Sequence, residues 1–241
     1  SDLSYLEQKY KSLNHQIEHI NTTIARKELE RFVIELAWKS SQIEGNTYDL
    51  LETEQLIKYA QESAGHTKQE ATMILNHKSA FETIFHHRSD FKKLSITNLK
   101  QLHNIMTLNL GVDSGVRKTP VGISGSVYVP MDNQWQLEEY LEQLCSIVNK
   151  TKHPIEKAFI TACMLAYIQP FQDGNKRTSR MMGNAILMAY DHYPLSYRTV
   201  DELDYKRAMV LFYELNSLYN FKRIFFEQYD YSLNSYFRTN D

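Results

Sequence analysis

Glycine and proline are scarce in this sequence, which contains 8 and 5 of them among 241 residues. Together they make up slightly less than half of their usual share, which is about 12% of a protein. A sandwich or barrel of many short strands needs frequent turns, so this scarcity argues against such folds and favours long helices. Long apolar runs are missing too. The longest extends from Ala158 to Ile168, whereas a membrane-spanning helix needs about 20 residues.

Cysteine is also rare, and neither sign of charge is in excess. Cys145 and Cys163 cannot build a disulfide framework, and we expect both to be buried as small hydrophobic residues in a reducing compartment. The 27 basic and 29 acidic residues leave a net charge of −2, which gives no reason to expect nucleic acid as a partner. The first residues show no secretory signal. We therefore expect a cytoplasmic protein without nucleic-acid or membrane partners.

Apolar residues recur at helical spacing along most of the chain. Near the N-terminus the steps alternate between three and four residues at Leu3, Leu6, Tyr10, Leu13, Ile17 and Ile20, which is typical of an amphipathic helix. A second helix is predicted from Ala25 to Ile43, and Glu44-Gly45-Asn46 ends it. Further helices are expected at about 51–63, 67–88, 95–109, 134–149, 154–168, 177–190, 201–219 and 221–236.

One segment, residues 111–130, differs from this pattern. It holds half of all the glycines together with Pro120 and Pro130. Apolar residues alternate on both sides of Ser124-Gly125-Ser126, which predicts a short β-hairpin. The expected fold class is therefore all-α with one β-hairpin. We divide the chain into an N-terminal helical extension (1–63) and a core domain (64–236).

A short polar loop, from Gln169 to Lys176, separates two apolar helices. Asp-Gly-Asn in front of a helix leaves backbone N–H groups free at the positive end of the helix dipole, which favours an anion. Arg177 and Arg180 lie at i and i+3 and can reach the same phosphate chain. Asp173 is placed to hold a hard cation such as Mg²⁺ on those phosphates. A capped helix start with two surface arginines explains the same residues, so the spacing leaves both interpretations open.

This loop resembles the signature of the Fic (Fido) family, His-Pro-Phe-x-Asp-Gly-Asn-Gly-Arg-x-x-Arg. The matching positions are Pro170, Phe171, Asp173, Gly174, Asn175, Arg177 and Arg180. Ser40-x-x-x-Glu44-Gly45 is similar to the family's inhibitory helix motif, which here lies N-terminal to the core. Residues 117–130 are similar to the family's flap, which aligns a target segment by strand addition. The resemblance extends over about residues 26–225.

The resemblance implies a helical bundle with a β-hairpin flap, and transfer of AMP from ATP to a Ser, Thr or Tyr hydroxyl of a target protein. Nucleotide-binding residues would be Gly174, Asn175, Lys176, Arg177 and Arg180, with catalytic roles for Asn175 and Arg177 and with Asp173 holding Mg²⁺. Glu44 would pair with Arg180 and prevent the γ-phosphate from binding in its productive position. Ser40 and Gly45 would complete this inhibitory motif. The target-docking flap would comprise Val121, Gly122, Ile123, Ser124, Gly125 and Tyr128.

Two positions depart from the family signature. Gln169 stands where the family has the catalytic histidine, and a carboxamide cannot take a proton as a general base near neutral pH. Because losing a general base typically costs about 10²–10⁴ in rate, we expect an inactive or weak enzyme. His153 and His192 flank the region, but we expect them at the surface or at helix ends. Lys176 replaces a glycine, as it does in the family's phosphotransferase branch, although that branch has Ala where this chain keeps Gly174. AMP is therefore the favoured transferred group, and Lys176 leaves another phosphate-bearing group open.

Three functions therefore stay open. The first is an autoinhibited adenylyltransferase silenced at Gln169, whether that glutamine is natural or introduced. The second is a nucleotide-binding pseudoenzyme or regulatory module without turnover. The third is removal of AMP from a target, in which Glu44 would position water. The expected partner is a protein with a hydroxyl side chain, and both self-modification and a homodimer stay open.

Overall fold

The computed structural model describes residues 2–12 and 23–236, and every regular element in these ranges is a helix. In chain order they are α1 (Asp2–Ser12), α2 (Thr23–Ile43), α3 (Leu50–Tyr59), α4 (Lys68–His86), η2 (Arg88–Lys92), α5 (Ile96–Met106), α6 (Gln134–Lys150), α7 (Pro154–Ile168), α8 (Asn175–Ala189), α9 (Glu202–Leu215) and α10 (Tyr219–Ser235). The all-α fold class is confirmed, and every helix expected from Ala25 onward has a counterpart. Of the N-terminal apolar series, Leu13, Ile17 and Ile20 lie outside the described residues.

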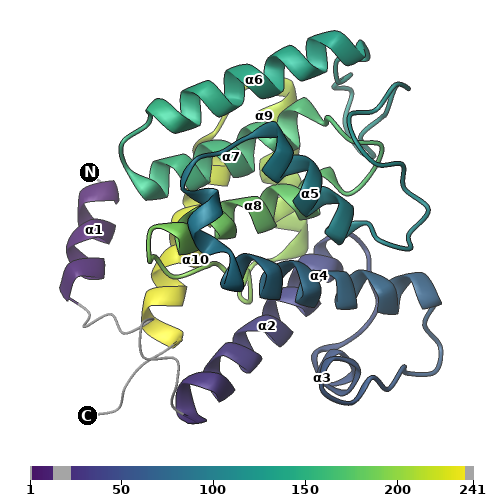
Figure 1. The fold of residues 1–241 in the computed structure, drawn as a ribbon, viewed down its shortest axis with the longest axis vertical. Coiled ribbons are helices and arrows are strands. Elements are labelled where there is room, and N and C mark those ends of the chain that lie inside the picture. Colours follow the sequence, from purple (N-terminus) through teal and green to yellow (C-terminus); the bar gives the residue numbers. More distant parts are fainter. Residues whose placement is uncertain (1, 13–22, 237–241) are drawn as a thin grey trace.

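Helix α8 lies in the middle of the molecule and is buried along almost its whole length (Figure 1). It packs most extensively against α7, where the backbones approach closely because Gly183 has no side chain. A Cβ at Gly183 would lie 3.4 Å from the Cβ of Ala162. α4, α5 and η2 cover other sides of α8. Arg177 and Arg180 belong to this enclosed helix. Because burying an unpaired charge is costly, their side chains need partners from the segments around α8.

The N-terminal helices contribute to the same core. α1 contacts α10, and its Leu6 belongs to one apolar cluster with Phe32 of α2 and Ile186 of α8. α2 packs against α3, α4 and α9 and also contacts α8. The boundary predicted between residues 63 and 64 falls in the segment that joins α3 to α4, and the division into two domains stays a prediction.

The predicted β-hairpin is not present, because residues 111–133 contain no strand. A turn does form around Ser124 and Gly125, closed by the Ser126 N–H donating to the Ile123 carbonyl at 3.1 Å. The arms on either side of this turn form no ladder, and Val127 and Val129 are 83% and 80% exposed. A two-stranded hairpin is marginal in isolation, and here neither a sheet nor a core covers one face of the arms.

Both cysteines are free and buried, as expected. Burial raises the pKa of the Cys145 thiol to about 11, which keeps it protonated and unreactive at neutral pH. In the part of the chain that the structure describes, no helix combines the length and the apolar character that crossing a bilayer requires.

Candidate functional site

The polar loop between α7 and α8 is fixed by bonds within itself. Gln169 ends α7 in the left-handed conformation, with a φ of 52°. The amide of Asn175 then clamps the loop, because its Oδ1 accepts from the Phe171 N–H at 2.9 Å and its Nδ2 donates to the Phe171 carbonyl at 2.8 Å. Phe171 is fully buried and stacks on His103 of α5, with ring centroids 3.8 Å apart. The loop is therefore a rigid platform in front of α8.

Gly174 is required at the end of this loop. Its φ is +76°, and a Cβ there would lie 2.8 Å from Cγ2 of Thr107, closer than carbon atoms can approach. Gly174 is also the N-cap of α8 and offers no side chain to the first N–H groups of that helix. The structure therefore contains the helix start with free N–H groups that the sequence predicts beside the loop. An anion is the natural partner for these N–H groups.

Asp173 presents its carboxylate at the mouth of the loop. Its side chain is 70% exposed, Oδ1 accepts from the Gly174 N–H at 2.5 Å, and Oδ2 lies 3.3 Å from Nη2 of Arg177. Within the described ranges no cluster of three or more His, Cys, Asp or Glu side chains could hold a metal. A lone carboxylate fits Mg²⁺ only when phosphate oxygens and water supply the other ligands. Asp173 therefore suits a metal that arrives with a nucleotide.

Arg177 is the clearest sign of a missing ligand. Its side chain is 3% exposed, and its Nη1 is buried without a hydrogen-bond partner. Burial lowers the pKa of the guanidinium, and the nearby Asp173 and Glu44 carboxylates oppose that shift. A buried N–H of a charged group is costly to leave unpaired, so a site that does so is built for a partner. Charge-assisted bonds to phosphate are what a guanidinium supplies best.

A hollow of about 260 Å³ opens beside this arginine. Its lining combines the loop, the start of α8, Glu44 and the flap, through Met73, Val121, Gly122, Ile123, Ser124, Gln169, Gln172, Asp173, Gly174, Asn175, Lys176 and Arg177. A second hollow of about 810 Å³ shares Glu44, Ile123, Ser124 and Lys176 with it and is otherwise lined mainly by α9. The residues assigned to separate motifs in the sequence thus meet around one pair of hollows.

Glu44 reaches into this region from the end of α2. Its Oε1 accepts from Nη1 of Arg180 at 2.9 Å, and Oε2 lies 3.4 Å from Nζ of Lys176. Burial alone would raise the pKa of Glu44, but the charges of Arg180 and Lys176 outweigh it and hold the pKa below its usual value of 4.5. Gly45, with a φ of +94°, lets the chain turn away directly after Glu44.

Arg180 is 1% exposed, and each of its three guanidinium nitrogens donates a hydrogen bond. Besides Glu44, it bonds Ser40 twice: Nε donates to Oγ at 2.9 Å and Nη2 to the backbone carbonyl at 2.8 Å. Burial opposes its charge, but Tyr205 and Glu44 keep the pKa above the ordinary value. Arg177 and Arg180, one helical turn apart, are thus in opposite states. Nη1 of Arg177 lacks a partner, whereas all three nitrogens of Arg180 are bonded.

Gln169 lines the smaller hollow but does not act as a base there. Its Nε2 donates to the Ala166 carbonyl at 2.5 Å. The flanking histidines do not replace it, because His153 bonds Glu7. His192 lies just beyond the end of α8, where its N–H donates to the Leu187 carbonyl at 2.9 Å, so of the two expected places the helix end is right and the surface is wrong. Its side chain is 7% exposed and bonds the hydroxyl of Tyr229. No base therefore stands at the position of the family histidine.

The flap is anchored at its base and tethered at its tip. Arg117 donates from its backbone N–H to Pro170 at 2.9 Å and from Nε to the Gln169 carbonyl at 2.7 Å, so the flap and the loop share one anchor. Tyr128 donates to the Tyr167 carbonyl at 3.2 Å. Val121 to Ser124 line the small hollow and Gly125 the larger one. The predicted flap residues therefore lie over the site, although they do not form strands.

Sequence reasoning missed two histidines beneath the site. His103 lies with its Nε2 2.9 Å from the Asp173 carbonyl, and His77 of α4 lies with its Nε2 2.9 Å from Oγ of Ser40. Both are almost completely buried. The available signal was a polar residue on the apolar face of an amphipathic helix, where it must find an internal partner.

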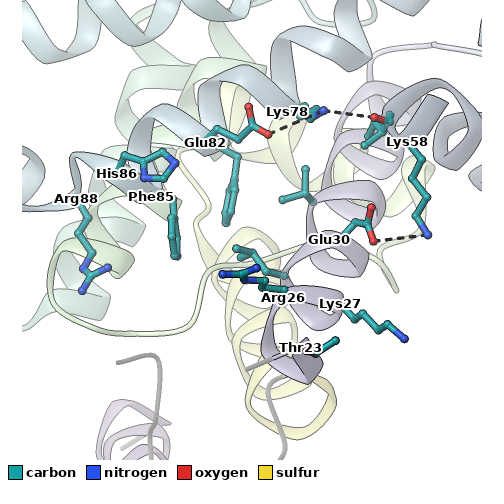
Figure 2. Close-up of a pocket in the computed structure, with 14 residues that line it drawn as sticks. Thr23, Arg26, Lys27, Glu30, Lys58, Lys78, Glu82, Phe85, His86 and Arg88 are labelled. Carbon is teal, nitrogen blue, oxygen red and sulfur yellow. Dashed lines mark hydrogen bonds and ion pairs between the residues drawn. The ribbon is translucent and has the colours of Figure 1, made fainter. Parts of the chain in front are cut away.

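A separate hollow of about 860 Å³ lies between the start of α2, the end of α3 and α4 (Figure 2). It shares no lining residue with the hollows at the loop. Two of its lysines face carboxylates within the hollow itself: Lys58 lies 3.6 Å from Glu30, and Lys78 lies 4.0 Å from Glu82 (Figure 2). The loop, rather than this hollow, combines unpaired buried charge with an open helix start.

Comparison with known proteins agrees with the geometry. The family model described as Fic/DOC family matches residues 93–187, which include the flap and the loop. The chain contains a Fic/DOC domain. Protein adenylyltransferase Fic of Nematostella vectensis is 30% identical over 174 residues, which are 70% of this chain and 40% of that protein. The protein of the same name in Drosophila grimshawi is 30% identical over 196 residues, 79% of this chain and 40% of its own length.

The chain thus spans about 40% of the length of these curated relatives. Among solved structures, a fragment of Fic-1 from C. elegans superposes with a TM-score of 0.78 at 21% identity, over 97% of this chain and 70% of that one. A Fic-domain signalling protein from Bacteroides thetaiotaomicron gives 0.72 at 20% identity, over 97% and 95%. At these identities the structures show that the whole described chain has the fold of Fic proteins.

Proposed function

We propose that this Fic domain binds ATP and is an adenylyltransferase scaffold, held in an inhibited state by Glu44 and deprived of its general base at Gln169. The observation that carries the proposal is the buried, unpartnered Nη1 of Arg177 beside a helix start without a side-chain cap. A phosphate group satisfies both at once. The names of the relatives, protein adenylyltransferase Fic, support ATP as the nucleotide.

The two adjoining hollows suit the two halves of a nucleotide. The 260 Å³ hollow is lined by polar groups of the loop and of α8 and suits phosphates. The 810 Å³ hollow is lined by apolar and aromatic side chains such as Met209, Val210 and Tyr213, with Tyr205 at its edge, and suits a nucleoside. Glu44 and Lys176 line both hollows. A triphosphate that continues from one to the other would pass Glu44, which is the carboxylate bound to Arg180.

The transfer itself forms a bond between a hydroxyl oxygen of the target and the α-phosphorus of ATP, and breaks the bond from that phosphorus to the bridging oxygen of the β-phosphate. Pyrophosphate leaves, and the hydroxyl proton needs an acceptor. Gln169 can donate or accept a hydrogen bond to orient the hydroxyl, but it cannot take up the proton. Arg177 and the start of α8 stabilise the phosphate charge. Turnover is therefore expected to be about 10²–10⁴ below that of a histidine enzyme.

Asp173 would hold Mg²⁺ against the nucleotide. Its carboxylate is 70% exposed at the edge of the phosphate hollow and is bound only to the Gly174 N–H and, at 3.3 Å, to Arg177. The metal would supply charge neutralisation on the phosphates. Exchange of Asp173 for alanine is then expected to remove the Mg²⁺ dependence of ATP binding.

A second function, nucleotide sensing without turnover, is favoured by one observation. One N–H of the Gln169 amide is engaged with the Ala166 carbonyl inside the protein, and the amide offers no group that takes up a proton. Every nucleotide-contacting group proposed above is present without that histidine. Restoring the histidine separates the two functions.

The test is intact-mass spectrometry after incubation with ATP and Mg²⁺. The chain as it stands is compared with Gln169→His and with Gln169→His combined with Glu44→Gly. We expect an AMP adduct only where histidine is restored, largest in the double variant, and none when Asp173→Ala is added. ATP binding without any adduct would replace the enzyme by the sensing function. An adduct of another mass would show that Lys176 accompanies transfer of a different group.

A further inference from the structure

His77 lies at the centre of α4, is 1% exposed and contacts both its own helix and α2, where Oγ of Ser41 lies 3.3 Å from its Nδ1. Its Nδ1 lies 2.8 Å from the backbone carbonyl of Met73, one turn earlier on α4. A carbonyl oxygen can only accept, so Nδ1 carries the ring proton. Nε2 is then the acceptor, and the hydroxyl of Ser40, 2.9 Å away on α2, donates to it.

The ring is neutral at physiological pH. Burial lowers the pKa of His77 to about 3, and the charges of Arg177 and Arg180 act in the same direction, while the bond to the Met73 carbonyl and the charge of Glu44 oppose them. A protonated ring would lose its acceptor and would place a second positive charge beside Arg180. The tautomer inferred from Met73 is therefore the one present while the protein is folded.

The direction of the Ser40 hydroxyl follows from this tautomer. Since its proton points to His77, an oxygen lone pair faces Nε of Arg180, which donates to it at 2.9 Å. The Ser40 carbonyl accepts from Nη2 at 2.8 Å. Two edges of the guanidinium are thus fixed on Ser40, and the third, Nη1, is directed at Glu44 at 2.9 Å.

We propose that His77 is a positioning residue of the inhibited state, which orients Ser40 so that Arg180 is held in register with Glu44. The link runs from α4 through α2 to α8 and consists of buried groups throughout. It rests on the inhibitory role proposed for Glu44. Without an acceptor at Nε2, the Ser40 hydroxyl can turn its proton toward the guanidinium, and Arg180 loses one of the bonds that keep it from a phosphate.

The test is titration calorimetry of ATP with the full chain. It uses two substitutions of His77 whose side chains differ in length. His77→Asn extends only to the Nδ1 position and so keeps the bond to Met73 but offers no acceptor to Ser40. His77→Gln reaches the Nε2 position and restores that acceptor. Each is measured with Glu44 present and with Glu44→Gly. Asn149→Ala, which removes two bonds to the Leu94 backbone in another part of the fold, controls for lost stability.

We expect His77→Asn to raise ATP affinity about threefold to tenfold when Glu44 is present, as loss of one net hydrogen bond predicts. The same substitution should leave affinity unchanged in the Glu44→Gly background, and His77→Gln should behave as the parent. Asn149→Ala should lower the melting temperature without changing affinity. Ser40→Ala removes the link from its other side, so it should reproduce the gain and should add nothing to His77→Asn.

Two outcomes would overturn the inference. If His77→Asn and Ser40→Ala lower the melting temperature but leave ATP affinity unchanged while Glu44→Gly raises it, His77 serves only the fold. If Glu44→Gly itself leaves affinity unchanged, the inhibitory role of Glu44 fails and the inference fails with it. Should His77→Asn not fold, Ser40→Ala in both backgrounds decides between the same outcomes.

Discussion

The loop at 169–174 and the flap at 117–130 both lack regular structure and both line the same hollow, yet the middle of the loop and the tip of the flap are held in opposite ways. In the loop, Phe171 is fully buried, and both of its backbone polar groups are bound by Asn175. In the flap, Val127 is 83% exposed, and its N–H donates to the Glu214 carboxylate at 2.9 Å. Buried bonds fix one segment, and bonds open to water hold the other.

This difference separates two tasks of the site. A hydrogen bond shielded from water resists disruption, because a group that loses its partner there stays unsatisfied. An exposed bond can be exchanged for water at little cost. Under the proposed function, the loop is preorganised for phosphate, and the flap would exchange its Glu214 bonds for those of an incoming target segment. Substitutions in the loop should cost global stability, and those in the flap should change local opening only.

The largest effect is expected at Arg117, which joins the two segments. Arg117→Met leaves the carbonyls of Gln169, Thr119 and Met131 without their donor. We expect the free energy of unfolding to fall by about 3 kcal/mol, since several bonds from a charged buried group are lost. Urea denaturation measures it. Lys118→Met, at the exposed neighbouring position, should leave the free energy of unfolding almost unchanged. Equal decreases for both variants would contradict the role of Arg117 as a shared anchor.

A smaller loss is expected at Gly174, with the flap glycine as its matched partner. Gly174→Ala places a Cβ 2.8 Å from Thr107 at a positive φ. This overlap and backbone strain should cost about 2 kcal/mol of unfolding free energy. Gly122 has an ordinary φ and nothing within 4 Å of its Cβ position. Gly122→Ala should therefore be neutral by thermal unfolding, and a comparable loss there would show that the flap is as rigid as the loop.

The next effect is a pH dependence that comes from the buried side of the loop. Burial lowers the pKa of His103 below its ordinary value of 6.5. Below pH 6.5 the unfolded chain then binds the proton that the folded chain refuses, so stability is complete above that pH and is lost as the pH falls. Between pH 6.5 and 5.5, the free energy of unfolding of His103→Gln should therefore fall by about 1 kcal/mol less than that of the parent chain. An unchanged slope of stability against pH would show that His103 is protonated in the fold.

The smallest global effect is expected at the tip of the flap. Glu214 accepts from both the Ser126 hydroxyl and the Val127 N–H, and these bonds lower its pKa. Glu214→Gln should leave the melting temperature unchanged, because the bonds are exposed. It should speed hydrogen exchange at the Val127 amide, and Glu227→Gln on α10 should not. A drop in melting temperature would mean that the flap contributes to the core.

Local sequence pattern was enough for the helices, because their apolar spacing coincides with the buried faces. It failed for the hairpin, since alternation at Val121, Ile123, Val127 and Val129 predicts strands only when something covers one face of them. In this chain Val127 and Val129 face solvent. The turn at Ser124-Gly125 does form, because a turn depends on local backbone preference rather than on a sheet.

The site divides in the same manner. The residues of the loop could be chosen from sequence, because they are contiguous and chemically distinctive. Their states could not be predicted. Arg177 and Arg180 look equivalent at i and i+3, yet Nη1 of Arg177 lacks a partner, whereas Arg180 is bound by Ser40 and Glu44. The alternative of surface arginines is excluded by their burial. His77 and His103 carry no motif, since their roles depend on helices distant in the chain.

The sequence by itself therefore determined that this chain is helical and that residues 169–180 form a polar loop and helix start suited to an anion. These properties follow from short-range spacing and from backbone chemistry. The tertiary structure decided which arginine side chain has an N–H group free for an anion, because packing alone brings partners such as Glu44 and Arg180 together from different parts of the chain. It also decided that the flap has no ladder, because strand pairing needs a covered face that neighbouring residues in the chain cannot provide.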